Sequence, residues 1–187
     1  ERICRAIARQ PIDRLPVGPY LANWTASFAG VPLSTYCTDA RQMAAVQLAA
    51  WERVGQDVIF PDADNYYLAE GFGCVSCFYE DNFPALERPA LEHPQQVFEL
   101  EVPDPYRDGR MPVYLEATQR IAEQVGDQAA IRVPGTGPFA VASYLIGIEQ
   151  FLFEVGRIQQ GRDLSNAAAV ERMLDLGTEA VIRFGLA

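Results

Sequence analysis

The stretch "DVIFPDADNYYLAEGFG", residues 57–73, decides the fold of this sequence. It begins with "DVIF", a short apolar run that is typical of a strand buried on both faces. It ends with "NYYLAEGFG" (65–73), which predicts a short helix. Two carboxylates, Asp62 and Asp64, stand between strand and helix, where acids are costly unless they cap, pair or carry chemistry.

Alternation along the strand separates the two acids. Val58, Phe60 and Asp62 share one face of an extended chain, because successive side chains point to opposite faces. Asp62 is therefore expected to be an inward-facing functional acid. Asp64 or Asn65 is expected to cap the following helix, since Asp and Asn are favoured at helix N-termini.

Helices are predicted on both sides of this stretch from apolar residues spaced three and four apart. The predicted helices cover residues 1–10, 38–55, 113–126, 138–155 (as one helix or a pair) and 165–187. Further strands are predicted over residues 14–21 and 129–137, and a loop of small residues over 22–32. Residues 74–110 hold several prolines and no steady period, which indicates an irregular excursion that includes a hairpin as one option.

The order of strands and helices indicates an α/β protein. Short apolar strands followed by amphipathic helices favour a parallel sheet covered by helices, either doubly wound or barrel-like. No glycine-rich nucleotide-binding motif follows any predicted strand. Three strands do not close a barrel, since a complete (β/α)8 domain needs about 250 residues. The sequence is therefore expected to be the first half of a larger protein, or a fold completed by association.

Composition excludes several classes of function. The 187 residues are 49% apolar and carry a formal net charge of −10, without a Lys/Arg cluster. Nucleic-acid binding is not expected, because it usually needs a basic patch. No segment approaches the roughly 20 apolar residues of a membrane span, and no signal-peptide pattern begins the sequence. We expect a cytoplasmic protein.

Cysteine and histidine are too few for the common metal and triad sites. Cys74 and Cys77 form one "CVSC", and no second pair exists to complete four zinc ligands. His93 is the only histidine and lies beside a proline in a polar segment, which disfavours a Ser-His-Asp triad. No metal site is expected within these residues.

Candidate binding residues gather where strands are predicted to end. The carboxyl ends of parallel strands carry the functional groups in α/β proteins. Asn23 and Trp24, preceded by Tyr20, follow the first predicted strand, and Thr136 follows the third.

Three further residues complete the candidate site. Arg132 lies within a buried strand and needs a partner, so we hypothesise that it meets Asp62. The aromatic residues Tyr66 and Phe72 are candidates for pocket walls, although such residues are often plain core.

The quoted segments also resemble a known family. "RLPVGPYL" (14–21), "GQDVIFPDADNYYLAEGFG" (55–73), "VPDPYRDGRMPVYLEATQRIAEQVGD" (102–127) and "GTGPFAVASYLIGIE" (135–149) occur in the order found in the amino-terminal half of the uroporphyrinogen decarboxylase superfamily. The resemblance implies a (β/α)8 TIM barrel. Residues 1–187 would then be the amino-terminal part of one barrel domain, with about the first three β/α units.

The resemblance also implies roles for individual residues. The decarboxylases carry Phe-Ser-Asp at the end of the second strand, and "FPD" (60–62) matches it, so Asp62 is implied to be catalytic. Their active-site tyrosine follows a Gly-x-Pro-Trp-Thr-Leu-type stretch, and "GPFAVASY" (137–144) places Tyr144 there. Their substrate carboxylates bind an Arg-Gln-Ala-Gly-Arg run, but here Leu21 and Ala22 stand where Arg and Gln would be.

The missing arginines favour one branch of the superfamily, the cobalamin-dependent methyltransferases of the methylcobalamin:coenzyme M type. The resemblance then implies a zinc ion held by the carboxyl-terminal half, methylcobalamin as donor, and a corrinoid protein or a small-molecule substrate as partner. A tetrapyrrole decarboxylase remains an alternative. A non-catalytic half-barrel that acts as a binding or assembly module is an alternative of another class. Such a half-barrel is expected to form a homo-oligomer, because it leaves a sheet edge and apolar helix faces exposed.

Overall fold

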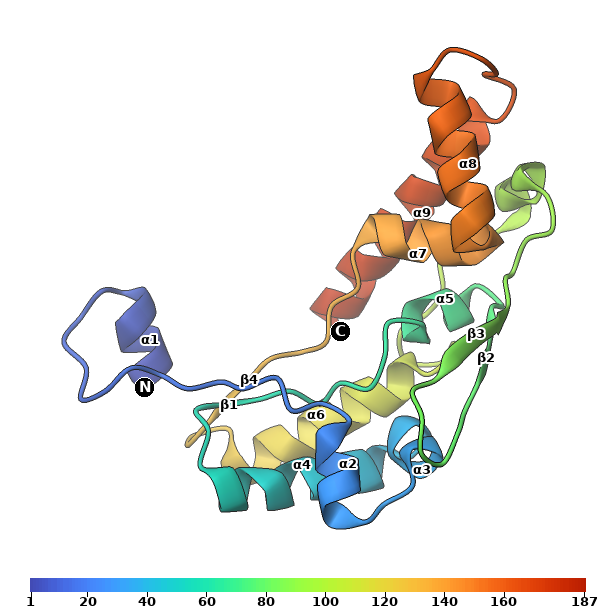
Figure 1. The fold of residues 1–187 in the computed structure, drawn as a ribbon. Helices are drawn as coiled ribbons and strands as arrows, with labels where there is room; N and C mark the ends of the chain where they lie inside the picture. The colour runs from blue at the N-terminus through green and yellow to red at the C-terminus, as the bar shows by residue number, and fades with distance from the viewer. The chain divides into compact units, whose positions relative to one another are not determined.

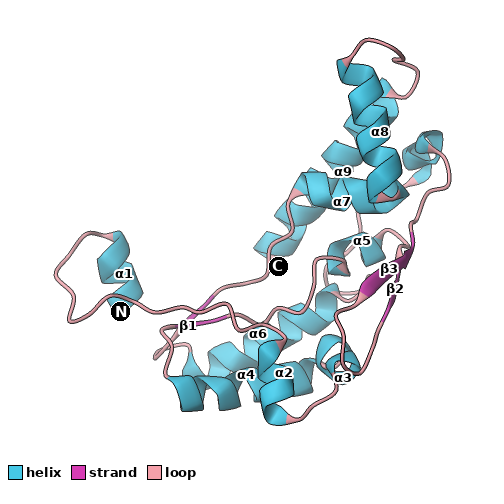
Figure 2. Cartoon of the chain, viewed as in Figure 1, coloured by secondary structure: helices cyan, strands magenta, loops and turns pink.

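The computed structural model describes all of residues 1–187 (Figures 1 and 2). The elements in chain order are α1 (Arg2–Ile7), α2 (Trp24–Ala29), α3 (Leu33–Thr38), α4 (Ala40–Val54), β1 (Val58–Ile59), α5 (Tyr67–Gly71), β2 (Val75–Cys77), β3 (Ala85–Arg88), the 3-10 helix η1 (Pro94–Glu99), α6 (Met111–Val125), β4 (Ala130–Ile131), α7 (Pro138–Ile146), α8 (Ile148–Gln159) and α9 (Ala167–Leu186).

These elements belong to two compact units, each of which is described by itself. The first unit comprises Glu1–Ala63, Phe78–Phe83 and Val113–Pro134. The second unit comprises Asp64–Cys77, Pro84–Pro112 and Gly135–Ala187. The organisation of residues 1–187 as part of one barrel domain stays a prediction.

The first unit is built on a parallel pair of strands. β1 pairs with β4 in the register Val58↔Ala130 and Ile59↔Ile131. Helices α4 and α6 cover this pair through a buried apolar cluster made of Ala44, Leu48, Ile59, Ile121, Val125 and Ala129, with Trp51 and Ile131 packed against it. Parallel strands covered by helices confirm the α/β content that the sequence predicted, although both strands are shorter than expected.

The predicted strand over residues 14–21 does not form. The segment runs without regular structure beside β1, where the Asp57 amide donates to the Val17 carbonyl at 2.7 Å. Pro16 and Pro19 have no N–H to donate, so they interrupt the ladder that a strand needs. The prediction was wrong because proline chemistry outweighed the apolar pattern.

The predicted loop over residues 22–32 was also wrong. Helix α2 forms within it and ends at Gly30, which has a left-handed backbone with φ of 69°. Small residues pack closely here: Ala26 is fully buried, and its helix packs against α4. Small side chains therefore serve helix packing in this segment.

The long helices agree with the sequence. In α4, Asp39 Oδ1 accepts hydrogen bonds from the amides of Arg41 and Gln42 at 2.8 and 3.1 Å. This is the expected N-cap, and Gly55 follows the last turn as expected. The predictions for α6 and α9 are confirmed, and each end of both helices lies within two residues of its predicted position.

The second unit gathers α7, α8 and α9 around short elements. The region predicted over 138–155 is a helix pair, α7 and α8, which meet at Gly147 with a bend of 108°. The strands β2 and β3 form the antiparallel hairpin considered for residues 74–110. None of the individual helices is long and apolar enough to cross a membrane, and only the bent α7–α8 pair reaches that length and composition.

Helices α7 and α9 approach so closely at Gly177 that a side chain does not fit. A Cβ atom there would lie 2.8 Å from the Pro138 carbonyl oxygen and 3.4 Å from Val141 Cβ. Gly177→Ala is expected to lower the free energy of unfolding by about 1–3 kcal/mol through overpacking. Urea denaturation measures the change. Gly185→Ala in the same helix meets nothing within 4 Å and should be neutral or stabilising by up to about 1 kcal/mol. Equal effects of both variants would contradict the close approach.

Candidate functional site

Asp62, which the sequence selected as the inward acid, is a buried carboxylate beyond the end of β1. Its exposed fraction is 6%. The Tyr20 hydroxyl donates a hydrogen bond to Asp62 Oδ2 at 2.9 Å. The Tyr20 ring also meets Phe60 edge-on, with ring centroids 5.7 Å apart. An acid buried to this degree needs such donors, because an unsolvated charge is otherwise costly.

The main chain of Asp62 is held by a buried polar network. The Tyr36 hydroxyl donates to the Asp62 carbonyl oxygen at 2.9 Å. Gln47 Nε2 donates in turn to Tyr36 Oη at 2.7 Å and to Thr25 Oγ1 at 3.2 Å. Burial raises the pKa of Tyr36, so the phenol stays a neutral donor. Helices α2, α3 and α4 thus fix the residue that carries the candidate acid.

Arg132 does not form the ion pair with Asp62 that the sequence suggested. Its side chain is exposed, and its guanidinium lies over the Phe60 ring, 5.5 Å from the centroid. The Arg132 amide donates to the Ile59 carbonyl at 3.0 Å, which continues the pairing of the two strands. Solvent and the aromatic face satisfy the cation, so a carboxylate partner is not required. Arg132 and Asp62 are nevertheless linked by one row of contacts: Arg132, Phe60, Tyr20, Asp62.

Asn23 and Trp24 stand close to the same region of the chain. Asn23 is buried, and its Nδ2 donates to the Ala63 carbonyl at 2.9 Å. No protein group donates to the buried Asn23 Oδ1, which is uncommon for a buried amide oxygen. Trp24 is half exposed and stacks on Phe28, with ring centroids 5.2 Å apart. Asn23 therefore supports the peptide next to Asp62, whereas Trp24 presents an open aromatic surface.

Tyr144, the second predicted catalytic residue, lies in the second unit against Tyr66. The two rings meet edge to face, with centroids 4.9 Å apart. Burial, followed by the neighbouring Tyr66 and the negative charge of Asp64, raises the pKa of Tyr144. The phenol therefore stays protonated at neutral pH and is suited to donate a hydrogen bond. The structure thus brings together two of the predicted site residues here.

Asp64 has a stronger partner than the helix it was expected to cap. Its Oδ1 does accept the Tyr66 amide at 2.8 Å, as a residue near a helix start does. Both of its oxygens also bind Arg110, at 2.8 and 2.9 Å. Arg110 binds Glu70 as well, with Nε and Nη2 each 2.7 Å from a carboxylate oxygen. The side chains of all three are less than 10% exposed, so Asp64 belongs to a buried ion triad.

The remaining predicted residues of the second unit are buried. Thr136 is 4% exposed, and its hydroxyl donates to the Asn65 carbonyl at 3.3 Å. Phe72 is 7% exposed, at the C-terminal end of α5. Their roles as binding residues stay predictions.

The two neighbouring cysteines bond to carbonyl groups and not to a common partner. Cys74 Sγ donates to the Tyr144 carbonyl at 3.4 Å, and Cys77 Sγ to the Ala85 carbonyl at 3.5 Å. Burial raises the pKa of Cys74 to about 11. No group of three His, Cys, Asp or Glu side chains is placed to hold a metal ion. The residues present therefore do not fit a zinc ion.

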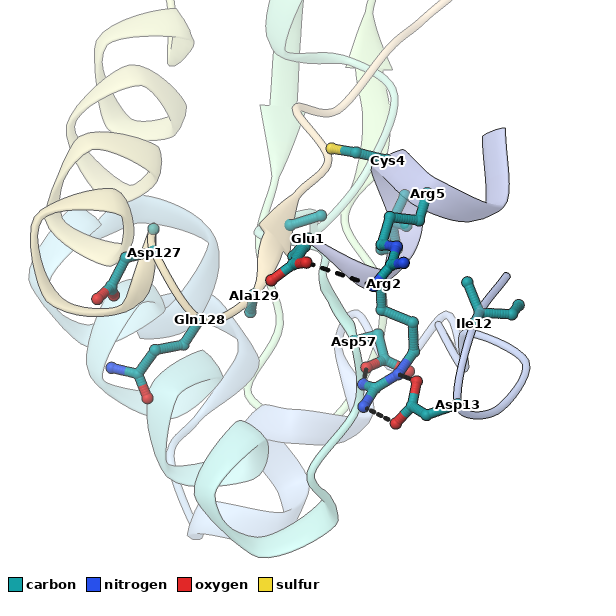
Figure 3. A pocket seen from close by; sticks show the side chains of 13 residues that line it. Glu1, Arg2, Cys4, Arg5, Ile12, Asp13, Asp57, Asp127, Gln128 and Ala129 are labelled. Atoms are coloured by element: carbon teal, nitrogen blue, oxygen red, sulfur yellow. Dashed lines mark hydrogen bonds and ion pairs between the residues drawn. The ribbon is translucent and has the colours of Figure 1, made fainter. Parts of the chain in front are cut away.

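A separate polar cleft of about 490 Å³ lies at the amino ends of β1 and β4 (Figure 3). Within it, Arg2 pairs with Asp13 at 2.7 Å and with Asp57. Hydrogen bonds from the Val17 amide, and then from Arg14 and Arg2, lower the pKa of Asp57. The cleft lies at the opposite end of β1 from Asp62. In parallel α/β folds that end serves stability more than chemistry.

Sequence reasoning missed the residues that hold the candidate acid. Nothing in the sequence around Tyr36 indicated that it would bind the main chain of Asp62. Gln47 could have been found, because it lies on the buried face of α4 with Met43 and Ala50. A polar residue on such a face predicts a buried hydrogen bond. Arg110 lies in a segment that was predicted to be rich in turns. Such a segment has no periodicity from which the burial of a side chain could be predicted.

A parallel strand pair covered by helices is the architecture of parallel α/β proteins. The family model described as uroporphyrinogen decarboxylase (URO-D) matches residues 1–187, and the chain belongs to this family. The fold class of the family is the TIM-barrel type.

The relatives include two kinds of enzyme. The chain is 24% identical to the uroporphyrinogen decarboxylase of Tolumonas auensis, over 98% of this chain and 57% of that protein. It is 26% identical to the methylated-thiol–coenzyme M methyltransferase of Methanosarcina mazei, over 79% of this chain and 41% of that protein. A solved structure, a methyltransferase from Methanosarcina mazei, matches with a TM-score of 0.81 at 26% identity, over 98% of this chain and 53% of its own. The chain thus spans about half the length of these relatives.

The buried triad predicts a large loss of stability when its cation is removed. Arg110→Leu leaves the carboxylates of Asp64 and Glu70 without their shared partner, and should cost about 3–5 kcal/mol in the free energy of unfolding. Arg120→Leu is the control, because Arg120 forms an exposed pair with Glu116 within α6 and should cost about 0.5 kcal/mol or less. Chemical denaturation of both variants checks this, and similar losses would contradict the role of burial.

The cysteines should differ in reactivity. Cys4 is exposed and should be alkylated first, whereas Cys74 is buried with a raised pKa and should resist. Because the thiolate is the nucleophile, labelling of Cys74 should rise about tenfold per pH unit until the pH nears its pKa. Mass spectrometry after iodoacetamide treatment of the native protein measures both rates. Rapid labelling of Cys74 near neutral pH would contradict the buried, neutral thiol.

Proposed function

We propose that these residues form about the first three β/α units of a (β/α)8 barrel, and that the complete protein transfers a methyl group from a methylated corrinoid to a thiol or similar acceptor. The transfer forms a carbon–sulfur bond, leaves both electrons of the methyl–cobalt bond on the corrinoid, and releases the thiol proton. The solved methyltransferase structure and the similar methyltransferase of Methanosarcina mazei support this choice.

The observation that carries the choice is the absence of arginine from residues 16–28, "PVGPYLANWTASF". The decarboxylases that this segment resembles have arginines at the corresponding positions, and those arginines bind the carboxylates of the substrate. Each lost bidentate arginine–carboxylate contact removes a strong charge-assisted pair. The nearby Arg2 and Arg14 do not replace them, because both are paired with Asp57. With a net charge of −10, a substrate of many carboxylates is poorly matched.

In this proposal Asp62 is the acid that orients polar groups of the substrate or the corrinoid. Its hydrogen bond from Tyr20 and the fixed main chain keep the carboxylate in one orientation. Tyr144, protonated at neutral pH, acts as a hydrogen-bond donor, and Tyr66 packs against it. Asn23, Trp24, Phe72, Thr136 and Arg132 are proposed binding residues.

We do not propose that these 187 residues bind zinc. The proposal assigns the zinc ligands to the carboxyl-terminal half of the barrel, and methylcobalamin to a corrinoid protein partner. What this chain contributes is binding and orientation of substrate. A homo-oligomer is expected for the half-barrel alternative alone, because a half-barrel leaves sheet edges open, whereas a closed barrel has none.

The runner-up is a tetrapyrrole decarboxylase with Asp62 at its centre. The relatives named uroporphyrinogen decarboxylase favour it, and identities of 24% and 26% do not separate the two activities. A non-catalytic half-barrel that acts in binding or assembly is the third possibility. It predicts that the full-length gene product catalyses neither reaction.

Asp62→Asn in the full-length gene product tests the proposal. The variant keeps the shape of the side chain but removes the charge, and should lower kcat/KM by about 10- to 100-fold, the value of a charged hydrogen bond. Loss of methylcobalamin absorbance with a thiol acceptor measures methyl transfer. Chromatography of porphyrins measures decarboxylation of uroporphyrinogen in parallel.

Asp39→Asn is the matched control for that experiment. It removes the same charge at an exposed helix cap, where Asn caps as well as Asp, so activity should not change. Full activity of Asp62→Asn would contradict the role of this acid. Decarboxylation without methyl transfer would establish the runner-up.

A further inference from the structure

Residues 17–20 follow β1 in the register of a parallel strand, although they do not form one. Val17 lies beside Asp57, because the Asp57 amide donates to the Val17 carbonyl at 2.7 Å. Gly18 lies beside Val58, so closely that a Cβ atom on Gly18 would be 2.8 Å from Val58 Cγ2. Both pairs are separated by the same 40 positions in the sequence.

The same register brings Tyr20 to the candidate acid. The Tyr20 ring meets Phe60, which is again 40 positions away, and its hydroxyl donates to Asp62 Oδ2 at 2.9 Å. Successive side chains of an extended segment point to opposite faces. A slip of one residue along β1 would therefore turn Tyr20 away from Asp62.

The main chain by itself does little to fix this register. Pro16 and Pro19 have no N–H group, so the ladder of hydrogen bonds that aligns paired strands is interrupted twice. The bond between the Asp57 amide and the Val17 carbonyl is the one main-chain hydrogen bond between this segment and residues 57–62. Side chains are therefore needed to hold the segment in place.

The Asp57 carboxylate supplies those side-chain bonds. Its Oδ2 accepts the Val17 amide at 2.8 Å and Arg14 Nη1 at 2.6 Å, and its Oδ1 accepts Arg14 Nη2 at 3.1 Å. Arg2 also donates to Asp57, and it binds Asp13 through two nitrogens at 2.7 and 2.8 Å (Figure 3). Hydrogen bonds between ionised groups are about twice as strong as neutral ones.

Asp57 is also the only point at which residues 1–17 are bonded to the rest of the first unit. Every hydrogen bond between the two parts involves its carboxylate or its amide. Helix α1 buries none of its residues and is far shorter than a helix that is stable in isolation. Apolar packing therefore cannot substitute for the bonds of Asp57.

We infer that Asp57 is a positioning residue for the candidate acid Asp62. It fixes the register of residues 14–20 at the amino end of β1, and this register places the Tyr20 hydroxyl against the carboxylate at the other end. The inference rests on the proposed role of Asp62 in methyl transfer. It assigns a part in the reaction to a residue that lies outside the candidate site.

A double-mutant cycle in the full-length gene product tests the inference, with methylcobalamin as donor and 2-mercaptoethanol as acceptor. Tyr20→Phe removes the hydrogen bond to Asp62 and should lower kcat/KM by about 10-fold. Asp57→Asn keeps the size of the side chain but removes the charge that binds both arginines, and should cost about 3- to 10-fold. In the Tyr20→Phe protein, Asp57→Asn should cost less than about 2-fold, because it acts through Tyr20. Fully additive losses overturn the inference.

Three single variants separate register from charge. Arg14→Met removes one partner of Asp57 and should lower kcat/KM by about 2- to 5-fold. Gly18→Ala pushes the segment away from Val58 without changing Asp57, and should lower kcat/KM in the same direction. Arg5→Met is the matched control, since Arg5 lies 3.6 Å from Glu1 and should leave kcat/KM unchanged. Equal losses in Arg14→Met and Arg5→Met contradict the inference.

Folding of each variant is checked by circular dichroism and urea denaturation. Arg14 is 46% exposed, so Arg14→Met is expected to fold. If Asp57→Asn unfolds, Arg14→Met takes its place in the cycle with Tyr20→Phe, and the same non-additivity is expected.

Carbon NMR of the Asp62 carboxyl group keeps this inference distinguishable from the proposed function. Because Tyr20 donates to the ionised acid, losing this donor favours the protonated form. Tyr20→Phe and Asp57→Asn should both raise the pKa of Asp62 by about 1 unit relative to the unmodified protein, and Arg5→Met should not. A rise in both variants without any methyl transfer supports the inference and contradicts the proposed reaction. Methyl transfer together with an Asp62 titration that Asp57→Asn leaves unchanged overturns the inference and keeps the proposed function.

Discussion

The parallel pairing of β1 with β4 is the constraint on which the first unit depends. Parallel strands cannot be joined by a tight turn, so the chain between residues 59 and 130 must leave the sheet and return. The pair itself is short, two residues on each strand, and its own hydrogen bonds are few. Its stability therefore comes from α4 and α6, which bury Ile59 beneath an apolar cluster. The same pairing brings Phe60 and Arg132 side by side, and so places the candidate site.

Two buried polar clusters organise the segments that follow β1, and they differ in kind. Around Asp62 the bonds are mostly neutral: Tyr36 and Gln47 satisfy one another and the peptide. Around Arg110 they are ionic, with one guanidinium shared by two carboxylates. Neutral, fully bonded networks fix geometry at little cost, whereas a buried ion cluster is intolerant of losing any member. The neutral network is suited to holding the main chain of Asp62 in one orientation, and the ion triad around Arg110 is suited to stabilising the fold.

The comparison of Asp62 with Asp64 shows what a local sequence pattern can predict about the partners of a buried acid. Both acids stand within one short segment, and alternation and capping predicted different roles for them. In the structure both are buried, Asp62 beside Tyr20 and Asp64 beside Arg110. The assignment of Asp64 as a cap was incomplete, because Arg110 lies 46 residues further along the chain. Arg132 is a second example. It was predicted within a buried strand, but β4 ends at Ile131 and Arg132 is exposed. Its contact with Phe60 depends on a ring orientation that the local sequence does not determine.

By itself the sequence determined the α/β class and the long helices, with the Asp39 cap of α4. It left residues 138–155 open between one helix and a pair, and it selected Asp62 as a candidate whose role stays a prediction. These features depend on periodicity and on local hydrogen bonding, which are properties of neighbouring residues. Tertiary structure alone decided that residues 14–21 run beside β1 without becoming a strand, that Tyr20 and Tyr36 hold Asp62, and that Arg110 joins Asp64 to Glu70. Those outcomes join residues far apart in the chain, because a buried charge or hydroxyl takes its partner from whatever the fold brings within hydrogen-bond distance.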